Sequence, residues 1–400
     1  MREACEARYS DRRPPRGTSM KLALLLLVSL ISLAAAPAHA HKPSDAYLTI
    51  ARDGTTLTGQ WDIALRDLEA AIGLDADADG AITWGEVRAK HNAIAAYALA
   101  RLGVRAANEP CTLRVTGHAI DTHTDGAYAV LTLAGACAAS APTLGIEYRL
   151  LFDVDPTHRG LLNYVERGES RSAVFSAEAP SRVVGGDTGG RLVQFGQFVD
   201  EGVWHIWTGF DHMLFLLSLL LPAVLVRRDG AWQAAASVRA AFIDVAKVVT
   251  AFTLAHSITL TLAALDVVSL PSRFVESAIA ASVVLAALNN VWPLVRNGRW
   301  IAAFGFGLLH GFGFAGALRD LGLPTGSLAL SLAGFNVGVE LGPLAIVAAF
   351  LPAAYALRST RAYTRVALAG GSLAIAAIAT VWFIERAFDL PVVATLAARG

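Results

Sequence analysis

His205-Ile-Trp-Thr-Gly-Phe-Asp211-His212-Met-Leu-Phe215 is the stretch that decides the architecture, because it begins an apolar run that continues through Leu225. It sets three ionisable side chains, those of His205, Asp211 and His212, at the head of a hydrophobic segment. Ionisable groups in lipid cost several kcal/mol unless they face a partner, an ion or water. The adjacent Asp211 and His212 therefore indicate a site inside a membrane-spanning region.

The composition also predicts a membrane protein. Hydrophobic residues make up 54% of the 400 residues, charged residues only 16%, and the mean hydropathy is +0.49, which is too apolar for an ordinary soluble chain. The length allows two domains. Because the formal net charge is zero, we expect no nucleic acid as a partner. The lipid bilayer is the expected partner, and the sequence indicates no protein partner.

The first 40 residues have the pattern of a secretory signal peptide. Lys21 supplies the positive end, residues 22–36 the apolar stretch, and Ala38-His39-Ala40 the small-x-small cleavage site. Residues 1–19 are polar and rich in arginine, so Met20 is an alternative start. The signal predicts that the segment after residue 40 is exported.

Residues 41–195 read as an exported β-rich domain. Short alternating runs such as 56–63, 127–133 and 146–152 suit half-buried strands and predict a small β-sandwich. Cys111 and Cys137 are the two cysteines of this domain, and cysteines in exported domains most often pair, so we expect a disulfide between them. Glycine-rich residues 183–195 read as a flexible linker.

One loop of this domain matches the twelve-residue EF-hand calcium loop, with predicted helices 65–74 and 87–102 on either side. Gly80 permits the sharp turn. The expected Ca²⁺ ligands are Asp75, Asp77, Asp79, the Ala81 carbonyl, Thr83 and Glu86. A single loop favours a structural calcium staple over a sensor. The alternative is an acidic turn without a fixed ion.

Beyond the linker, residues 196–400 predict a six-helix transmembrane domain. Each apolar segment is long enough to cross a hydrocarbon core of ~30 Å at ~1.5 Å per residue. The predicted spans are Trp204–Val226, Phe242–Leu265, Phe274–Val295, Trp300–Leu318, Ser327–Leu357 and Thr364–Glu385, the fifth with a tilt or break near Pro343.

The loops between these spans predict the orientation. Those after spans one, three and five carry seven arginines (227, 228, 239, 296, 299, 358 and 361), whereas the opposite loops carry two (273 and 319). Arginine-rich loops stay in the cytoplasm. We therefore expect a multi-pass protein of the bacterial inner membrane, with the first domain and the C-terminus on the periplasmic side.

Ligand-type side chains from four predicted spans share one layer in this topology. Counting ~1.5 Å per residue from the outer helix ends gives depths of ~11–20 Å for Asp211, His212, His256, His310, Asn336 and Glu340. His205 lies ~10 Å above His212 if the helix is continuous, so we predict it at the mouth of the site unless the helix begins near Gly209.

Several neighbours are expected to support this layer. Thr253 and Ser257 flank His256 and are predicted to hydrogen-bond its second ring nitrogen. Glycines 307 and 311 allow another helix to approach His310 closely. Glu276, near the outer end of the third span, is a candidate entrance carboxylate.

Three imidazoles and two carboxylates suit a first-row divalent cation. Imidazole favours nickel, cobalt, copper or zinc over calcium or magnesium. Copper(I) is less favoured, because the layer contains no thiolate and Met213 is the one methionine of the membrane half.

The membrane half resembles the HupE/UreJ family of nickel and cobalt permeases over residues 200–385. The motifs that carry the resemblance are His205-x5-Asp211-His212, Phe252-Thr-Leu-Ala-His256-Ser, Gly307-Leu-Leu-His310-Gly-Phe-Gly-Phe-Ala and Phe335-Asn-Val-Gly-Val-Glu340. Ile206 stands where the family usually has proline. The resemblance implies a permease that passes Ni²⁺ or Co²⁺ from the periplasm to the cytoplasm.

Two other classes of function have different sequence signatures. An enzyme is not expected, because the membrane half has neither His-Glu-x-x-His nor a Gly-x-Ser-Gly nucleophile turn. A non-transporting assembly factor for metalloenzymes, or a metal sensor that acts through the exported domain, is the alternative to transport. No Walker loop is present, so transport without ATP hydrolysis is favoured.

Overall fold

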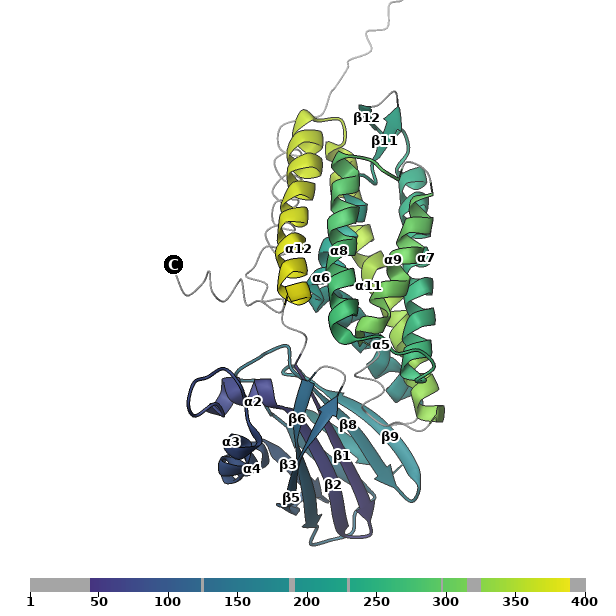
Figure 1. The fold of residues 1–400 in the computed structure, drawn as a ribbon. Helices are drawn as coiled ribbons and strands as arrows, with labels where there is room; N and C mark the ends of the chain where they lie inside the picture. Colours follow the sequence, from purple (N-terminus) through teal and green to yellow (C-terminus); the bar gives the residue numbers. More distant parts are fainter. Residues whose placement is uncertain are drawn as a thin grey trace, which may run out of the picture.

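The computed structural model describes residues 44–123, 126–186, 191–228, 231–295, 298–314 and 325–388. A β-rich region comes first, and a helical region follows from residue 191, stacked on it end to end (Figure 1). This order confirms the predicted fold class at the level of strands followed by apolar helices. The predicted signal peptide, with its alternative start at Met20, lies outside the described residues.

Two sheets form the β-rich region. The larger has the order β5-β6-β2-β1-β8-β9, with β1 (Asp45–Asp53), β2 (Thr56–Ala64), β5 (Thr112–His123), β6 (Gly126–Ala136), β8 (Arg159–Glu166) and β9 (Glu169–Phe175). The smaller has the order β10-β7-β3-β4, with β3 (Leu102–Ala106), β4 (Glu109–Pro110), β7 (Thr143–Tyr148) and β10 (Ser181–Gly185). Neighbouring strands are antiparallel except β1 and β8, which run parallel.

The core of this region lies between the two sheets. Leu144, Ile146 and Tyr148 alternate along β7 and are buried, as expected for a strand with one face covered. Trp61 of β2 packs on Tyr148 with ring centroids 5.5 Å apart, so side chains of both sheets meet. The region is thus a two-layer β-sandwich.

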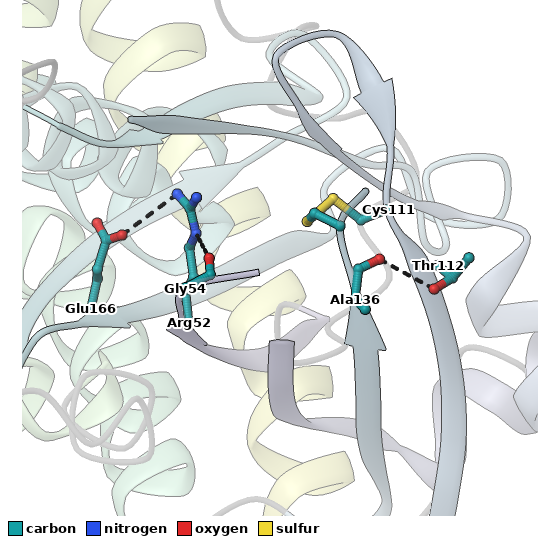
Figure 2. Close-up of a disulfide and its surroundings, with 7 residues drawn as sticks. Arg52, Gly54, Cys111, Thr112, Ala136 and Glu166 are labelled. Carbon is teal, nitrogen blue, oxygen red and sulfur yellow. Dashed lines mark hydrogen bonds and ion pairs between the residues drawn. A yellow bond between two sulfur atoms is a disulfide. The ribbon is translucent and has the colours of Figure 1, made fainter. Parts of the chain in front are cut away.

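A disulfide joins Cys111 to Cys137 beside the ends of β5 and β6 (Figure 2). The Thr112 hydroxyl donates to the Ala136 carbonyl at 3.2 Å next to it. On the neighbouring strands, Arg52 of β1 forms an ion pair of 3.5 Å with Glu166 of β8. The disulfide and the hydrogen bond thus link β5 to β6, and the ion pair links β1 to β8.

Three short helices interrupt the sandwich between β2 and β3. They are α2 (Leu65–Ile72), α3 (Trp84–Ala89) and α4 (His91–Leu99). The loop predicted to bind calcium connects α2 to α3. The second predicted helix, 87–102, is in fact two helices that meet at Lys90, and the first of them begins earlier because Thr83 caps it at Trp84.

A buried polar network fastens α2 to the sandwich. The Ser44 hydroxyl donates to Asp67 of α2 at 2.7 Å and lies 2.6 Å from Nδ1 of His158. Nε2 of His158 lies 2.8 Å from the Tyr148 hydroxyl. Burial, and to a smaller extent the charge of Arg159, lower the pKa of His158 to about 3. The imidazole is therefore neutral at physiological pH.

Acid is expected to unfold the sandwich through His158. Its pKa is depressed from 6.5 to about 3 in the folded state, so stability that is fully present above pH ~6.5 is lost as the pH falls toward 3. The slope approaches ~1.4 kcal/mol per pH unit. Burial raises the pKa of Asp67. Protonation of this carboxyl at lower pH therefore favours the folded state and opposes the effect of His158. Thermal unfolding between pH 7.5 and 4.5 measures this slope, and His158→Gln should flatten it. An unchanged slope in that variant contradicts the assignment.

The helical region contains α5 (Arg191–Thr208), α6 (Phe210–Leu220), α7 (Val238–Ala264), α8 (Ser272–Val291), α9 (Arg299–His310), α11 (Thr325–Leu357), the π-helix η1 (Tyr363–Gly370) and α12 (Gly371–Phe388). A small hairpin of β11 (Leu225–Arg228) and β12 (Ala231–Ala234) lies at the end farthest from the β-sandwich (Figure 1). α11 continues as helix through Pro343 and Pro352, although a tilt or break was predicted near Pro343.

Within the described residues, three helices are long and apolar enough to cross a membrane: Ser272–Val291, Gly326–Leu357 and Tyr363–Phe388. A fourth span is formed if α5 and α6 count as one, although they are bent by 71°. The bounds predicted for the first span were therefore wrong, and the segment is two helices instead of one. Its helix begins earlier, at Arg191, breaks at Gly209, and ends at Leu220, before the β11 strand.

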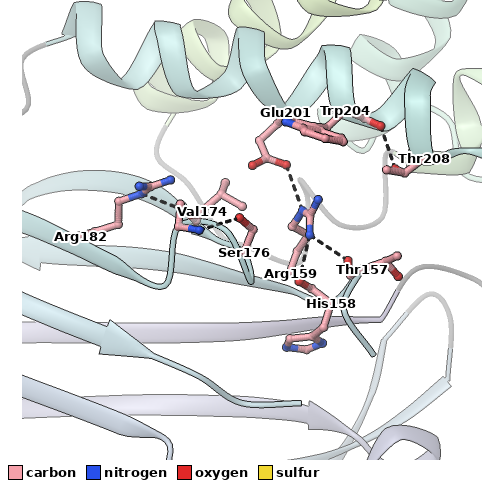
Figure 3. Close-up of polar contacts among 10 residues, drawn as sticks. Thr157, His158, Arg159, Val174, Ser176, Arg182, Glu201, Trp204 and Thr208 are labelled. Atoms are coloured by element: carbon pink, nitrogen blue, oxygen red, sulfur yellow. Dashed lines mark hydrogen bonds and ion pairs between the residues drawn. The ribbon is translucent and has the colours of Figure 1, made fainter. Parts of the chain in front are cut away.

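The β-sandwich contacts the helical region through polar side chains. Gln194 of α5 donates to Ser172 of β9 at 2.8 Å and to Ser331 of α11 at 3.1 Å. Arg159 of β8 pairs with Glu201 of α5 at 3.5 Å (Figure 3). Residues 183–195, predicted as a flexible linker, instead contain the end of β10, which pairs with β7, and the start of α5.

Candidate metal centre

The break between α5 and α6 brings two histidines of the opening motif together. The ring centroids of His205 and His212 are 4.7 Å apart, although seven residues separate them. A Cβ at Gly209 would lie 2.6 Å from the His205 carbonyl oxygen and 2.9 Å from Nδ1 of His212, so only glycine fits the bend. The prediction that His205 stands apart at the mouth was wrong, because the helix is not continuous here.

His256 of α7 completes a group of three. Its ring centroid lies 6.2 Å from that of His205 and 6.1 Å from that of His212. One ring nitrogen from each of the three lies within 4.8 Å of the others, the geometry of a shared ion. His256 is fully buried on the bundle interior. Three separate segments thus present imidazoles to one point.

Four of the six ring nitrogens of this group are buried and have no hydrogen-bond partner within the described residues. Among the described residues, Nε2 of His205, Nε2 of His212 and both ring nitrogens of His256 are buried without a partner. Each such polar atom costs ~1–3 kcal/mol relative to a satisfied one. The predicted bonds from Thr253 and Ser257 to His256 are therefore not formed. The hydroxyl of Thr253 instead donates to Glu340 on α11. A cation at the centre would give each of the three rings a partner for one nitrogen.

His310 borders the group from α9. Its ring centroid is 5.2 Å from that of His212. Its Nε2 lies 2.8 Å from the hydroxyl of Ser282 on α8, while Nδ1 is buried with no partner in the described part of the chain. Sequence reasoning missed Ser282, since a serine in an apolar helix follows no periodic pattern that marks it.

Asp211 faces an arginine that sequence reasoning also missed. Its Oδ2 accepts a hydrogen bond of 3.0 Å from Arg386 of α12, in an ion pair whose side chains are 21% and 13% exposed. The other oxygen, Oδ1, is buried and makes no hydrogen bond to any described residue. Arg386 lies just past the end of the last predicted span, where a cation at the outer boundary looks like a solvated terminus.

Glu340 and Asn336 lie outside the group of three histidines. Glu340 accepts hydrogen bonds from Thr253 and, at 2.7 Å, from Thr250, both on α7. Because these threonines precede His256 on the helix, they lie toward the end that carries the β11–β12 hairpin. Oδ1 of Asn336 is buried without a partner among the residues that the structure describes. Glu276 accepts from Ser272 on its own helix at 2.6 Å.

Glycines set the distances between the helices that carry the site. A Cβ at Gly307 would lie 2.3 Å from the Phe252 carbonyl oxygen, and one at Gly311 would lie 2.3 Å from that of His256. The predicted close approach of a helix near His310 is thereby confirmed, and the helix is α7. Gly202 of α5 and Gly338 of α11 likewise let the backbones of these two helices lie close together.

The loop between α2 and α3 forms a second group of acidic oxygens. Carboxylate oxygens of Asp75, Asp77 and Glu86 lie within 4.8 Å of one another, and Gly80 has a left-handed φ of 85°. The Glu86 carboxylate accepts from Thr83 N at 2.8 Å and from Ala76 N at 2.7 Å, and these bonds lower its pKa.

Asp79 lies outside this acidic group. Its Oδ1 accepts from the backbone N–H of Ala81 at 2.7 Å. Within the described residues, Oδ1 of Asp75 is buried without a partner. The donor set of the loop thus fits a hard cation that takes oxygen ligands.

Comparison with known proteins matches the helical half to one family. Residues 186–386, half of the chain, match the family model described as HupE / UreJ protein. The match starts after β10 and ends at Arg386, so it includes every histidine of the metal centre. A search of curated proteins found no match.

Gly311→Ala is expected to disturb the centre by pushing α7 away from α9. The new Cβ would meet the His256 carbonyl oxygen and the Thr259 hydroxyl, so we expect a loss of ~1–3 kcal/mol of stability from overpacking. Thermal unfolding of the purified protein measures it. Gly305→Ala on the same helix is the control, because a Cβ there meets nothing within 4 Å. Equal midpoints for the two variants would contradict this packing.

Proposed function

We propose that this chain, which belongs to the HupE/UreJ family, is a permease that passes a divalent transition-metal ion through the centre formed by His205, His212 and His256. The family is associated with nickel or cobalt transport, or with the maturation of urease or hydrogenase. The observation that carries the proposal is the convergence of three imidazoles, each with at least one buried nitrogen that has no partner within the described residues. Neutral histidine nitrogens bind borderline ions such as Ni²⁺ and Co²⁺.

The ligand set suits transport better than permanent binding. Three neutral imidazoles give a sparse shell that contributes no charge of its own, and the nearby Asp211 carboxylate is already paired with Arg386. A structural transition-metal site usually has four ligands and is closed. An ion held by fewer groups, with replacement oxygens close by, can leave again. We take Ni²⁺ or Co²⁺ as the cargo, because these are the metals whose transport is associated with the family.

A route inward follows α7. Thr253 and Thr250 lie one and two turns from His256, at ~4.5 Å per three residues, and both hold the carboxylate of Glu340. The cation is proposed to pass from the imidazoles to Glu340 and then to the cytoplasmic end. The six-span topology, the inner-membrane location and the periplasmic position of the β-sandwich belong to the same proposal and are supported by the arginine-rich loops.

Cellular metal content is expected to reveal the cargo. Cells that make the wild type should accumulate one of nickel, cobalt, zinc, copper or manganese, as measured by mass spectrometry. His212→Ala and His256→Ala should abolish the rise, because each removes one of three ligands. His91→Ala, a histidine of α4 outside the helical region, should leave it intact. Equal accumulation in all variants, or none with the wild type present in the membrane, would count against transport.

The absence of any accumulation would favour the other activity of the family, metalloenzyme maturation. In that case we propose that the β-sandwich is the part that contacts the metalloenzyme. Affinity capture on the intact protein in membranes, followed by identification of bound metalloenzyme subunits, distinguishes this function from transport.

The acidic loop is proposed to hold Ca²⁺ as a structural staple. Asp75, Asp77 and Glu86 would supply its carboxylate oxygens, and the ion would fix α3 relative to α2. Through Asp67, Ser44 and His158, α2 is in turn fastened to the sandwich. The calcium ion would therefore stabilise the exported domain without taking part in transport.

Calcium should raise the thermal midpoint of the purified protein by several °C, because a ligand that binds only the folded state stabilises it. Addition of a chelator should reverse the shift. Glu86→Gln should remove most of the calcium response, whereas Glu147→Gln on β7, outside the loop, should keep it. A calcium response that persists in Glu86→Gln would place the ion elsewhere.

A further inference from the structure

Arg386 brings a fixed positive charge to the edge of the metal centre. It lies in the last described turn of α12, and its Nη2 donates to Oδ2 of Asp211 at 3.0 Å. Asp211 immediately precedes His212, whose ring belongs to the group of three imidazoles. The Arg386 guanidinium thus pairs with the carboxylate that immediately precedes one histidine of the imidazole group.

The guanidinium of Arg386 is held by few hydrogen bonds for an arginine whose side chain is only 13% exposed. It makes one hydrogen bond to Asp211 instead of a two-pronged one, and its Nη1 reaches the Glu276 carbonyl at a long 3.4 Å. Its Nε is buried and has no partner in the described residues. Its centre lies 5.8 Å from the Trp382 ring. An arginine with a purely structural role would be expected to use its donors more fully.

One oxygen of the Asp211 carboxylate has no partner. Oδ1 of Asp211 is buried and unpartnered within the part of the chain described, although a carboxylate oxygen is a strong acceptor. The Asp211–Arg386 pair is neutral as a whole, so the charge of the carboxylate next to His212 in the sequence is already compensated.

We infer that Arg386 is a tethered counter-cation that competes with the transported ion for Asp211. When the ion is bound, Asp211 turns its carboxylate to the ion and Arg386 is released; when Arg386 returns to Asp211, the ion loses a ligand and leaves. Arg386 thereby weakens binding and speeds release. This inference rests on the proposed transport function and adds the residue that sets the affinity of its site.

Nickel binding to the full-length protein in detergent, measured by calorimetry, tests the inference. Removal of the charge in Arg386→Gln should lower the Kd for Ni²⁺ roughly fivefold or more, the range of a typical coupling between sites. Arg386→Lys keeps a cation and should stay near the wild-type Kd. Nickel uptake by vesicles that contain Arg386→Gln should be slower, because the ion is held longer.

Two further variants exclude an indirect effect. Arg299→Gln removes another ion-paired arginine, which contacts Asp244 at 3.7 Å, and should leave the Kd unchanged. In an Asp211→Asn background, Arg386→Gln should no longer tighten binding, because the two cations have lost the group they share. This double-mutant comparison also holds if the single Arg386→Gln variant folds poorly.

An equal or higher Kd in Arg386→Gln, with a wild-type thermal midpoint, would overturn the competition. So would tightening that persists in the Asp211→Asn background. Failure of the transport proposal looks different: wild-type protein would then not bind nickel, or His256→Ala would bind it as tightly as the wild type.

Discussion

Everything at the metal centre depends on the bend at Gly209. An unbroken helix would separate His205 from His212 by ~10 Å along its axis, and two imidazoles at that distance cannot hold one ion. The 71° bend between α5 and α6 brings the rings to 4.7 Å. A residue without a side chain is required at the bend, because the His205 carbonyl and the His212 ring occupy the space of a Cβ.

Close helix contacts place the third imidazole and its neighbour. Gly307 and Gly311 let α9 lie against the backbone of α7, so that His256 and His310 approach His212 from two further helices. Several ring nitrogens of these histidines are then buried without side-chain partners among the described residues. Burial of unpartnered nitrogens is tolerable only if something else compensates, which is why the geometry favours a bound cation.

Much of this arrangement follows from the sequence, and the exceptions have physical causes. Hydrophobic patterning and residue counting place His212, His256 and His310 in one layer, since depth in a membrane follows from position in a helix. They do not reveal the break at Gly209, because glycine is also common in unbroken membrane helices. Ser282 and Arg386 were missed because contacts between helices depend on rotation about the helix axes, which residue counting does not determine.

The bend also gives the two helices of the opening motif different neighbours. α5 is clamped to the β-sandwich through Gln194 and Glu201 and packs closely on α11 at Gly338, while α11 contacts α7 and α7 contacts α9. α6 packs mainly on α8 and also touches α11 and α12. A change of angle at Gly209 would therefore shift His212 on α6 relative to His205 on α5, and with it the spacing of the three imidazoles.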